Sequence, residues 1–293
     1  MFPNFIRKIK IMIAFLGMGH LGANFVKALL KKGQQVNVWN RTPAKAKALE
    51  ADGANAYDHV EDAVRGTNRI HLTLKDDEAV NEILEKASTG FEPGVIIIDH
   101  STTSANGAAE RTELWKSRGY TYLHAPVFMG PQNALEGTGT MLVSGDQELI
   151  SRLEPELAQM TGKVVNFGLK NNTAAGMKLI GNLFLIAMTA GISDALSLAK
   201  SFGISSDAVG DLFNAWNPAA MIPARLKKIT SNTFDQPTWE LNMARKDARL
   251  MIEGAEQGAM HLMAIPAIAV EMDKWIAKGQ GHMDWTVIAK DAV

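Results

Sequence analysis

The stretch that decides the fold is IMIAFLGMGHLG, which occupies residues 11–22. The apolar residues 11–15 predict a short buried strand, and residues 23–32 predict a helix that ends at Gly33. The glycines between them have the spacing of a dinucleotide-binding turn: one permits the tight turn, one lets the backbone approach a pyrophosphate, and one lets helix and strand pack. A plain glycine-rich turn is the alternative. The residues expected to hold the dinucleotide here are Gly17, Met18, Gly19, His20, Leu21 and Gly22.

The same stretch imitates a signal peptide, because Arg7, Lys8 and Lys10 precede its apolar run. We favour the strand and turn, since glycines interrupt the run early and it is far shorter than the roughly 20 apolar residues of a membrane span. We interpret residues 1–9 as an extension, or as an artefact of the start site if Met12 is the true start.

Strands and helices alternate after this turn. Apolar runs predict strands at residues 35–39, 70–74, 95–99, 120–127 and 140–144. Helices are expected at residues 43–50, 77–86 and 104–118, with Asp76 or Asp77 capping the second. Strands that are apolar throughout and alternate with helices indicate an α/β fold with a parallel sheet covered on both faces.

The second half of the chain predicts helices only. Residues 173–202 form one long periodic segment, with Asn172 or Thr173 as its N-cap. A helix of that length spans about 45 Å, so we expect it to bridge two domains or to build a subunit interface. Further helices are expected at residues 206–216, 219–230, 241–258 and 265–278. The predicted domains are therefore 1–172, which binds the dinucleotide, and 173–293, which is helical.

The composition excludes several classes of function. The 293 residues are 46% apolar and 21% charged, with a formal net charge of −1, as in an ordinary globular protein without the basic excess of nucleic-acid binding. The absence of cysteine excludes disulfides, thiolate zinc sites, iron–sulfur clusters and a cysteine nucleophile. No histidine pair has metal-ligand spacing, so no metal is expected. We expect a cytoplasmic protein that binds neither nucleic acid nor a membrane.

The end of the second strand bears on the type of dinucleotide. An NAD site usually places Asp or Glu there to hold the ribose 2′-hydroxyl, whereas this chain has Asn40, Arg41 and Thr42. A guanidinium can pair with a 2′-phosphate through charge-assisted hydrogen bonds, and no carboxylate is present to repel it. These three residues favour NADP(H). A solvated arginine after a strand is the alternative.

Two polar side chains share one face of the long apolar helix. Lys178 and Asn182 are four residues apart, and burying an ammonium or an amide without partners is costly. A lysine whose pKa is lowered by desolvation can donate or accept the proton that accompanies hydride transfer, and Asn182 could orient the substrate. Taken alone, an exposed lysine and a capping asparagine would be the better explanation of the pair.

An ordered set of motifs runs along nearly the whole chain from Lys10, and together they resemble the β-hydroxyacid dehydrogenase family. This family includes 3-hydroxyisobutyrate dehydrogenase, tartronate semialdehyde reductase and glyoxylate and succinic semialdehyde reductases. The motifs are the Gly17-x-Gly19-x-x-Gly22 turn, Asn40-Arg41-Thr42, Asp99-His100-Ser101-Thr102, Ala125-Pro126-Val127, Gly137-Thr138, Lys178-x-x-x-Asn182 and Lys246-Asp247.

The resemblance implies roles for individual residues. Lys178 matches the catalytic lysine of the family and Asn182 its substrate-orienting asparagine. Ser101 matches a substrate-binding position. Thr102, near the nicotinamide, Leu74 and Lys246 match positions that contact the cofactor. The resemblance also implies an N-terminal Rossmann domain with a mostly parallel sheet. It implies a helical C-terminal domain like that of 6-phosphogluconate dehydrogenase, which serves substrate binding and helps to form a homodimer or homotetramer.

The chain departs from the family where the substrate carboxylate is usually held. A Ser-Gly-Gly stretch normally follows Ala-Pro-Val, but Phe128, Met129 and Gly130 stand there instead. Phe128 removes a hydroxyl, and two large apolar side chains enter the expected pocket, although Gly130 and the local amides could still bind an anion. The usual short 3-hydroxy acid is therefore less certain as the substrate.

Three functions follow from these patterns. The first is an NADP(H)-dependent oxidoreductase that interconverts a small hydroxy acid or alcohol and its semialdehyde or keto form, with Lys178 as general acid and base. The second is an imine reductase, which the apolar Phe128 favours, although such enzymes generally carry Asp or Tyr in place of Lys178. The third is a non-catalytic dinucleotide-binding assembly protein, as in relatives that have lost the lysine.

Overall fold

The computed structural model describes residues 12–293, so the expectations for residues 1–9 and for Ile11 lie outside the described residues. Contacts group the chain into two compact units, Met1–Asn182 and Leu183–Val293, and the division falls within the long helix. The domain boundary expected at residue 172 stays a prediction.

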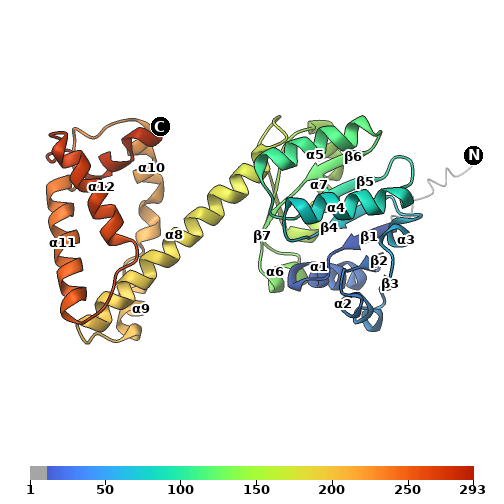
Figure 1. The fold of residues 1–293 in the computed structure, drawn as a ribbon, viewed down its shortest axis with the longest axis horizontal. Coiled ribbons are helices and arrows are strands. Elements are labelled where there is room, and N and C mark those ends of the chain that lie inside the picture. The colour runs from blue at the N-terminus through green and yellow to red at the C-terminus, as the bar shows by residue number, and fades with distance from the viewer. Residues whose placement is uncertain (1–11) are drawn as a thin grey trace, which may run out of the picture. The chain divides into compact units, whose positions relative to one another are not determined.

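A six-stranded parallel sheet forms the centre of the first unit (Figure 1). Its strands lie in the order β3-β2-β1-β4-β5-β6. The order reverses between β1 and β4, where a doubly wound sheet binds its ligand beyond the carboxyl ends of the strands. The predicted Rossmann fold is confirmed. The strands are β1 Met12–Leu16, β2 Gln35–Trp39, β3 Asn55–Tyr57, β4 Arg69–Leu72, β5 Ile96–Asp99 and β6 Thr121–His124.

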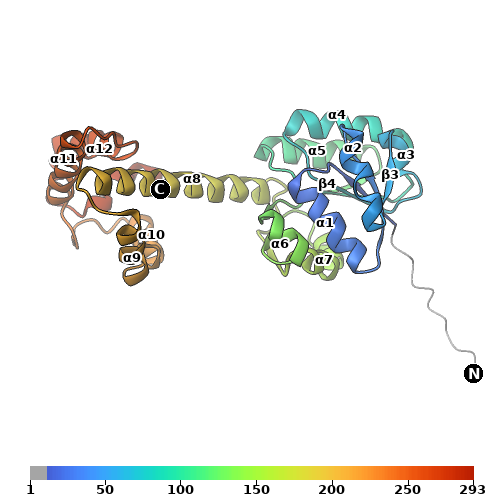
Figure 2. The same cartoon turned by 90° about the horizontal axis from the view of Figure 1, so that it is seen from below.

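Helices cover both faces of this sheet (Figure 2). Along β1, Ile13 and Phe15 pack on one face, whereas Ala14 and Leu16 pack on the other, as the two-residue period of a strand requires. The first face is covered by α1 His20–Lys31, α6 Pro131–Glu136 and α7 Gln147–Thr161. The second is covered by α3 Val60–Val64, α4 Asp77–Ala87 and α5 Ala105–Ser117. Shorter helices are α2 Pro43–Lys47, η1 Glu50–Asp52 and η2 Ser88–Gly90.

The single strand predicted at residues 120–127 is wrong. The chain leaves the first sheet after His124, and β7 Val127–Phe128 belongs to a second sheet. Pro126 has no N–H to donate to a ladder, and its carbonyl oxygen accepts from the backbone N–H of Leu142 at 2.8 Å. In the second sheet, β7 pairs antiparallel with β8 Thr140–Val143, which pairs parallel with β9 Lys163–Asn166. The sequence analysis missed β3, α3, α6, α7 and β9.

The long helix, α8, spans Thr173–Ser201, as predicted to within one residue. By length and composition alone α8 could cross a membrane, because its most apolar window has a mean hydropathy of 1.6 and only 6% of that window is buried. A single such helix is weak support for a membrane span, since long helices of other proteins pass the same test. The expectation of no membrane contact stays a prediction.

The second unit is helical, as expected. Its buried cluster is small and lies between α11, α12 and the C-terminal turn: Phe234, Leu241, Ala244, Ala248, Ala269, Met272, Trp275 and Val287. Its elements after α8 are α9 Ser206–Ala215, η3 Pro218–Met221, α10 Ile222–Thr230, α11 Leu241–Gln257, α12 Ile265–Ala277 and η4 Trp285–Ala292. The helix predicted at 219–230 is thus a short η3 followed by α10.

Candidate active site

The glycine turn between β1 and α1 has the geometry that a pyrophosphate needs. Gly17 has a φ of +100°, and a Cβ added there would fall on the carbonyl oxygen of Thr73. A Cβ on Gly22 would fall on the carbonyl oxygen of Gly17. A Cβ on Gly19, in contrast, would meet nothing within 4 Å, so this side of the turn is open. Gly19 is also the N-cap of α1, whose first N–H groups suit an anion.

Asn40 ties the glycine turn to the end of β2. Its Oδ1 accepts from the backbone N–H of Met18 at 2.9 Å, and its Nδ2 donates to the carbonyl oxygen of Thr42 at 3.0 Å. The Met18 side chain is buried in the core, so only its backbone faces the turn. Arg41 is exposed and makes no hydrogen bond or ion pair to any described residue. Its guanidinium is therefore available to a ligand.

A cleft of about 350 Å³ lies beside this turn, which is large enough for part of a dinucleotide. Five of the predicted cofactor residues line it: Gly17, Gly19, Asn40, Arg41 and Leu74. The sequence analysis missed the side of the cleft that α4 forms. Glu82 on that side pairs with Lys86 at 2.5 Å, which offsets its charge near Arg41.

The turn after β5 exposes Thr102 and buries the residue on either side of it. These buried neighbours are Ser101 and Thr103. The Ser101 hydroxyl accepts from the backbone N–H of Leu74 at 2.8 Å, which joins the turns that follow β4 and β5. Ser101 was expected to bind substrate, but its hydroxyl is engaged with the protein.

Lys178, on the first turns of α8, lies against Phe128. Its Nζ donates to Oδ1 of Asn182 at 3.1 Å and is 4.2 Å from the centre of the Phe128 ring. Burial lowers the pKa of Lys178 below its ordinary value of 10.5. A Cβ on Gly181 would fall on the Phe128 ring, so the ring packs directly on the helix backbone there. Lys178 and Asn182, the predicted catalytic pair, therefore form one cluster with Phe128, the residue at which the chain departs from the family.

The remaining predicted residues are placed as follows. Met129 and Gly130 are partly buried next to Phe128, and Gly130 is the N-cap of α6. His20 begins α1 and is exposed, and Leu21 packs partly against the core. Lys246 lies on α11 in the second unit, where it forms an ion pair with Asp247 at 3.0 Å. Its role at the cofactor stays a prediction.

Three histidines beneath the site are fully buried. Nδ1 of His71 is 2.9 Å from Nε2 of His100, and Nδ1 of His100 is 2.8 Å from the carbonyl oxygen of Ala125. Burial lowers the pKa values of His71, His100 and His124, that of His100 to about 4. Among residues 12–293, no group of three or more side chains could hold a metal ion.

Comparison with known proteins identifies the family. Residues 12–168 match the sequence profile of the NAD binding domain of 6-phosphogluconate dehydrogenase, which is more than half of the chain. The chain belongs to this dehydrogenase family. The family also includes the 3-hydroxyisobutyrate dehydrogenases, so the resemblance seen in the sequence is confirmed, and the protein is a dinucleotide-binding oxidoreductase.

Individual relatives cover most of the chain. A probable 3-hydroxyisobutyrate dehydrogenase of Mycobacterium tuberculosis (strain ATCC 25618 / H37Rv) is 27% identical over 248 residues, which are 82% of this chain and 84% of the relative. The cytokine-like nuclear factor N-PAC of Homo sapiens is 30% identical over 244 residues, which are 82% of this chain and 44% of that protein.

Among solved structures, the imine reductase from Myxococcus stipitatus in complex with NADP⁺ is similar, with a TM-score of 0.88 over 96% of this chain and 100% of that chain. The sequence identity is 20%, so this similarity shows a shared fold and not a shared activity.

Proposed function

We propose that this protein is an NADP(H)-dependent oxidoreductase that interconverts a small hydroxy acid or alcohol and its semialdehyde or keto form. The observation that carries the proposal is Lys178, a half-buried ammonium whose one hydrogen-bonding partner among the described residues is Asn182. Burial lowers its pKa, which is what a proton donor needs in order to work near neutral pH.

Lys178 and Asn182 have different roles at the reacting centre. When bound, the nicotinamide supplies or accepts the hydride. Lys178 gives its Nζ proton to the oxygen that becomes the alcohol, and takes a proton from the alcohol in the reverse direction. Asn182 holds the ammonium in place through its Oδ1 and keeps its amide N–H groups free to orient the substrate oxygen. The Phe128 ring excludes water from one side of the ammonium.

The preference for NADP(H) is also proposed, and it rests on Arg41. The glycine turn fits either dinucleotide, but no Asp or Glu stands at the end of β2 to accept bonds from a ribose 2′-hydroxyl. Arg41 lines the cleft and is free to pair with a 2′-phosphate, while Asn40 is used to hold the turn. The imine reductase from M. stipitatus, which has the same fold, was crystallised with NADP⁺.

The test is NADPH oxidation by the purified protein over a panel of semialdehydes, 2-keto acids and uncharged aldehydes, with NADH in parallel. We expect turnover of at least one carbonyl compound with NADPH favoured over NADH. Turnover of cyclic imines alone would replace this proposal with the second candidate below. Tight NADPH binding without turnover of any compound would favour the third possibility, a non-catalytic dinucleotide-binding assembly protein.

Phe128 favours a second candidate, an imine reductase. It places an aromatic face over Lys178 where the family usually has a hydroxyl for a carboxylate, and an apolar pocket suits an uncharged C=N compound. Lys178 argues against this candidate, because a charged ammonium beside the site repels a protonated iminium. A panel of cyclic imines next to the semialdehydes discriminates between the two.

We also propose that the protein is a homodimer or homotetramer. Support comes from the apolar side chains of α8 in the second unit, which remain exposed there, including Leu183, Phe184 and Ile186. Apolar patches of this kind mark interaction surfaces in soluble proteins. Light scattering after size-exclusion chromatography measures the molar mass directly.

A further inference from the structure

Hydrogen bonds to three of its residues hold the turn after β5, residues 100–104. The backbone N–H of Ser101 donates to Oδ1 of Asp99 at 2.8 Å. The hydroxyl of Thr103 accepts from Arg111 at 2.8 Å, and the N–H of Ser104 donates to Oδ2 of Asp77 at 2.8 Å. Thr102 lies between these anchors with its side chain exposed. The turn is thus clamped on both sides of Thr102.

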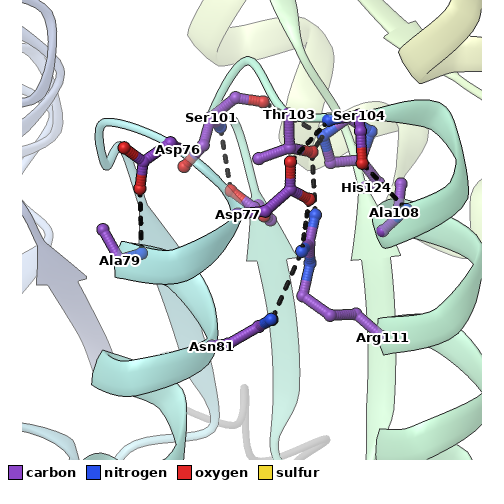
Figure 3. Close-up of polar contacts among 12 residues, drawn as sticks. Asp76, Asp77, Ala79, Asn81, Ser101, Thr103, Ser104, Ala108, Arg111 and His124 are labelled. Atoms are coloured by element: carbon purple, nitrogen blue, oxygen red, sulfur yellow. Dashed lines mark hydrogen bonds and ion pairs between the residues drawn. The ribbon is translucent and has the colours of Figure 1, made fainter.

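Arg111 is the centre of this clamp (Figure 3). The residue is 2% exposed, and each nitrogen of its guanidinium has a partner. Nη1 donates to Asp77 at 2.7 Å and to Asn81 at 3.3 Å, both on α4. Nε donates to the Tyr122 hydroxyl at 2.9 Å on β6, and Nη2 donates to Thr103. One side chain on α5 therefore connects α4, β6 and the turn.

Each ionisable group in this network has a hydrogen-bonding partner. The Tyr122 hydroxyl donates to Oδ2 of the fully buried Asp99 at 2.6 Å, and Arg111 pairs with Asp77. Burial and the neighbouring Asp99 raise the pKa of Tyr122 well above 10, so it remains a donor. Buried ion pairs seldom add net stability, but a planar guanidinium fixes geometry through its bidentate bonds. The network is better explained by positioning than by stability.

The position of the turn in the sheet indicates which part of the cofactor it meets. Arg41, at the end of β2, would take the 2′-phosphate of the adenosine half, and the glycine turn after β1 would take the pyrophosphate. The other half of the dinucleotide must then extend across the switch point toward the ends of β4 and β5. Ser101 joins the turns after these two strands through Leu74.

We propose that Arg111 is a positioning residue for the nicotinamide half of the cofactor. It acts through Thr103 and Asp77, which fix the turn that presents Thr102, and it does not act on the adenosine half. This inference rests on the proposed function, because it takes the cofactor to be NADP(H). Loss of the clamp lets the turn move, and displacement of a positioning group by about 1 Å can cost on the order of a hundredfold in rate.

The experiment compares two ligands in wild-type protein and three variants. NADPH reports both halves of the site, while adenosine 2′,5′-bisphosphate reports the adenosine half alone. The variants are Arg111→Lys, which keeps the charge but loses the fork of bonds, Thr103→Val, which removes one hydroxyl, and Thr103→Ser, which keeps it. Thr112→Val is the matched control, since the Thr112 hydroxyl bonds only within α5, to the carbonyl oxygen of Ala108.

For Arg111→Lys and Thr103→Val, we expect NADPH affinity and turnover of the best carbonyl substrate to fall by about 10- to 100-fold. The affinity for adenosine 2′,5′-bisphosphate should stay within about twofold of wild type in every variant, and Thr103→Ser and Thr112→Val should behave as wild type. Equal loss of both ligands would overturn the inference, because it would indicate general loss of structure. Unchanged NADPH binding and turnover in both variants would overturn it as well.

The wild-type protein separates failure of this inference from failure of the proposed function. If wild type binds neither ligand, the NADP(H) proposal is wrong and the inference falls with it. If wild type binds both and the variants do not separate them, only the positioning role of Arg111 is wrong.

Discussion

The two compact units differ in where they keep their apolar side chains. In the first, residues 12–182, helices cover both faces of the sheet, and the largest apolar side chains of the strands are buried. In the second, residues 183–293, the buried cluster is small, and α9 and α10 bury no residue. Ile186 is 72% exposed and Leu226 is 59% exposed. The first unit has a complete core, whereas the second presents apolar surface that another molecule would cover.

The two units also differ in the polar and ionisable side chains that they bury. The first unit keeps histidines and an arginine inside, and uses them beneath the binding turns. In the second unit, buried carboxylates bind neighbouring segments. Asp194 accepts from three backbone N–H groups at the start of α12, and Asp284 accepts from Lys228 and Thr238. We propose that the first unit holds the cofactor site and that the second provides an interaction surface. The predictions below test that division.

The largest effect is expected from Lys178→Ala. Loss of general acid and base catalysis should lower kcat by about 10²- to 10⁴-fold, while NADPH affinity stays close to wild type. Steady-state kinetics and NADPH fluorescence titration measure the two quantities. Lys200→Ala, at the other end of α8, should leave both unchanged. Retention of most of the turnover by Lys178→Ala would remove the lysine from the mechanism.

Acid should destabilise the first unit before the second. Burial holds the pKa values of His71 and His100 below 6.5, and that of His100 at about 4, so the unfolded chain takes up protons below pH 6.5 that the folded unit does not. The free energy of unfolding should fall by about 1.4 kcal/mol per pH unit for each of these histidines.

Asp284 in the second unit behaves differently. Burial alone would raise its pKa, but bonds from Lys228, Thr286 and Thr238 outweigh it and hold the pKa well below 3.8. The stability that Asp284 provides is present above pH 3.8 and is lost only below it. Hydrogen exchange at pH 6.5 and 4.5, corrected for intrinsic rates, should show peptides of the first unit losing protection first. Earlier loss in the second unit would contradict the comparison.

Ile186→Asp should dissociate the proposed oligomer without unfolding the chain. Ile186 is exposed in the second unit, so a charge costs little in an isolated chain, but removing a buried isoleucine from an interface costs about 2–3 kcal/mol in each copy. Sedimentation velocity should show the molar mass falling to that of a monomer. Gln257→Asp, at an exposed polar position on α11, is the control. A monomeric wild type would show that the apolar surface has another use.

Arg41→Asp should weaken NADPH selectively. Loss of a charge-assisted pair and addition of a like charge should raise the Kd for NADPH by about 10- to 100-fold and leave that for NADH almost unchanged. Lys45→Asp, two residues into α2 and outside the cleft, controls for general charge effects. An unchanged ratio of the two Kd values would argue against the preference for NADP(H).

The smallest effect is expected from Phe128→Ser. A hydroxyl in place of the ring should bind a substrate carboxylate and raise kcat/KM for semialdehyde acids relative to uncharged aldehydes by about tenfold. Water should also reach Lys178 and bring its pKa closer to 10.5, which the pH dependence of kcat measures. Phe128→Leu keeps an apolar side chain and should not gain carboxylate substrates. A gain in Phe128→Leu equal to that in Phe128→Ser would attribute the effect to space alone.

The spacing of residues along the chain was enough to predict much of the secondary structure of the first unit. The glycine turn, β2 and the long helix were predicted closely, and Asp76 was one of the two caps expected for α4, because each depends on neighbours within a few residues. The elements that were missed have weak local signals. Pro155 stands inside α7 and normally indicates a helix end, and β3 has only three residues.

The features of the candidate site also separate into those with a local signal in the sequence and those that depend on distant residues. The glycine turn, the residues after β2 and the shared helix face of Lys178 and Asn182 could be predicted from the sequence, because turn and helix geometry relate residues a few positions apart. The inward side chain of Ser101, the contact of Phe128 with Lys178 and the bonds of Arg111 to Asp77, Tyr122 and Thr103 became visible only in the folded chain. These contacts connect residues that are far apart in sequence, and the packing of sheet and helices alone brings them together.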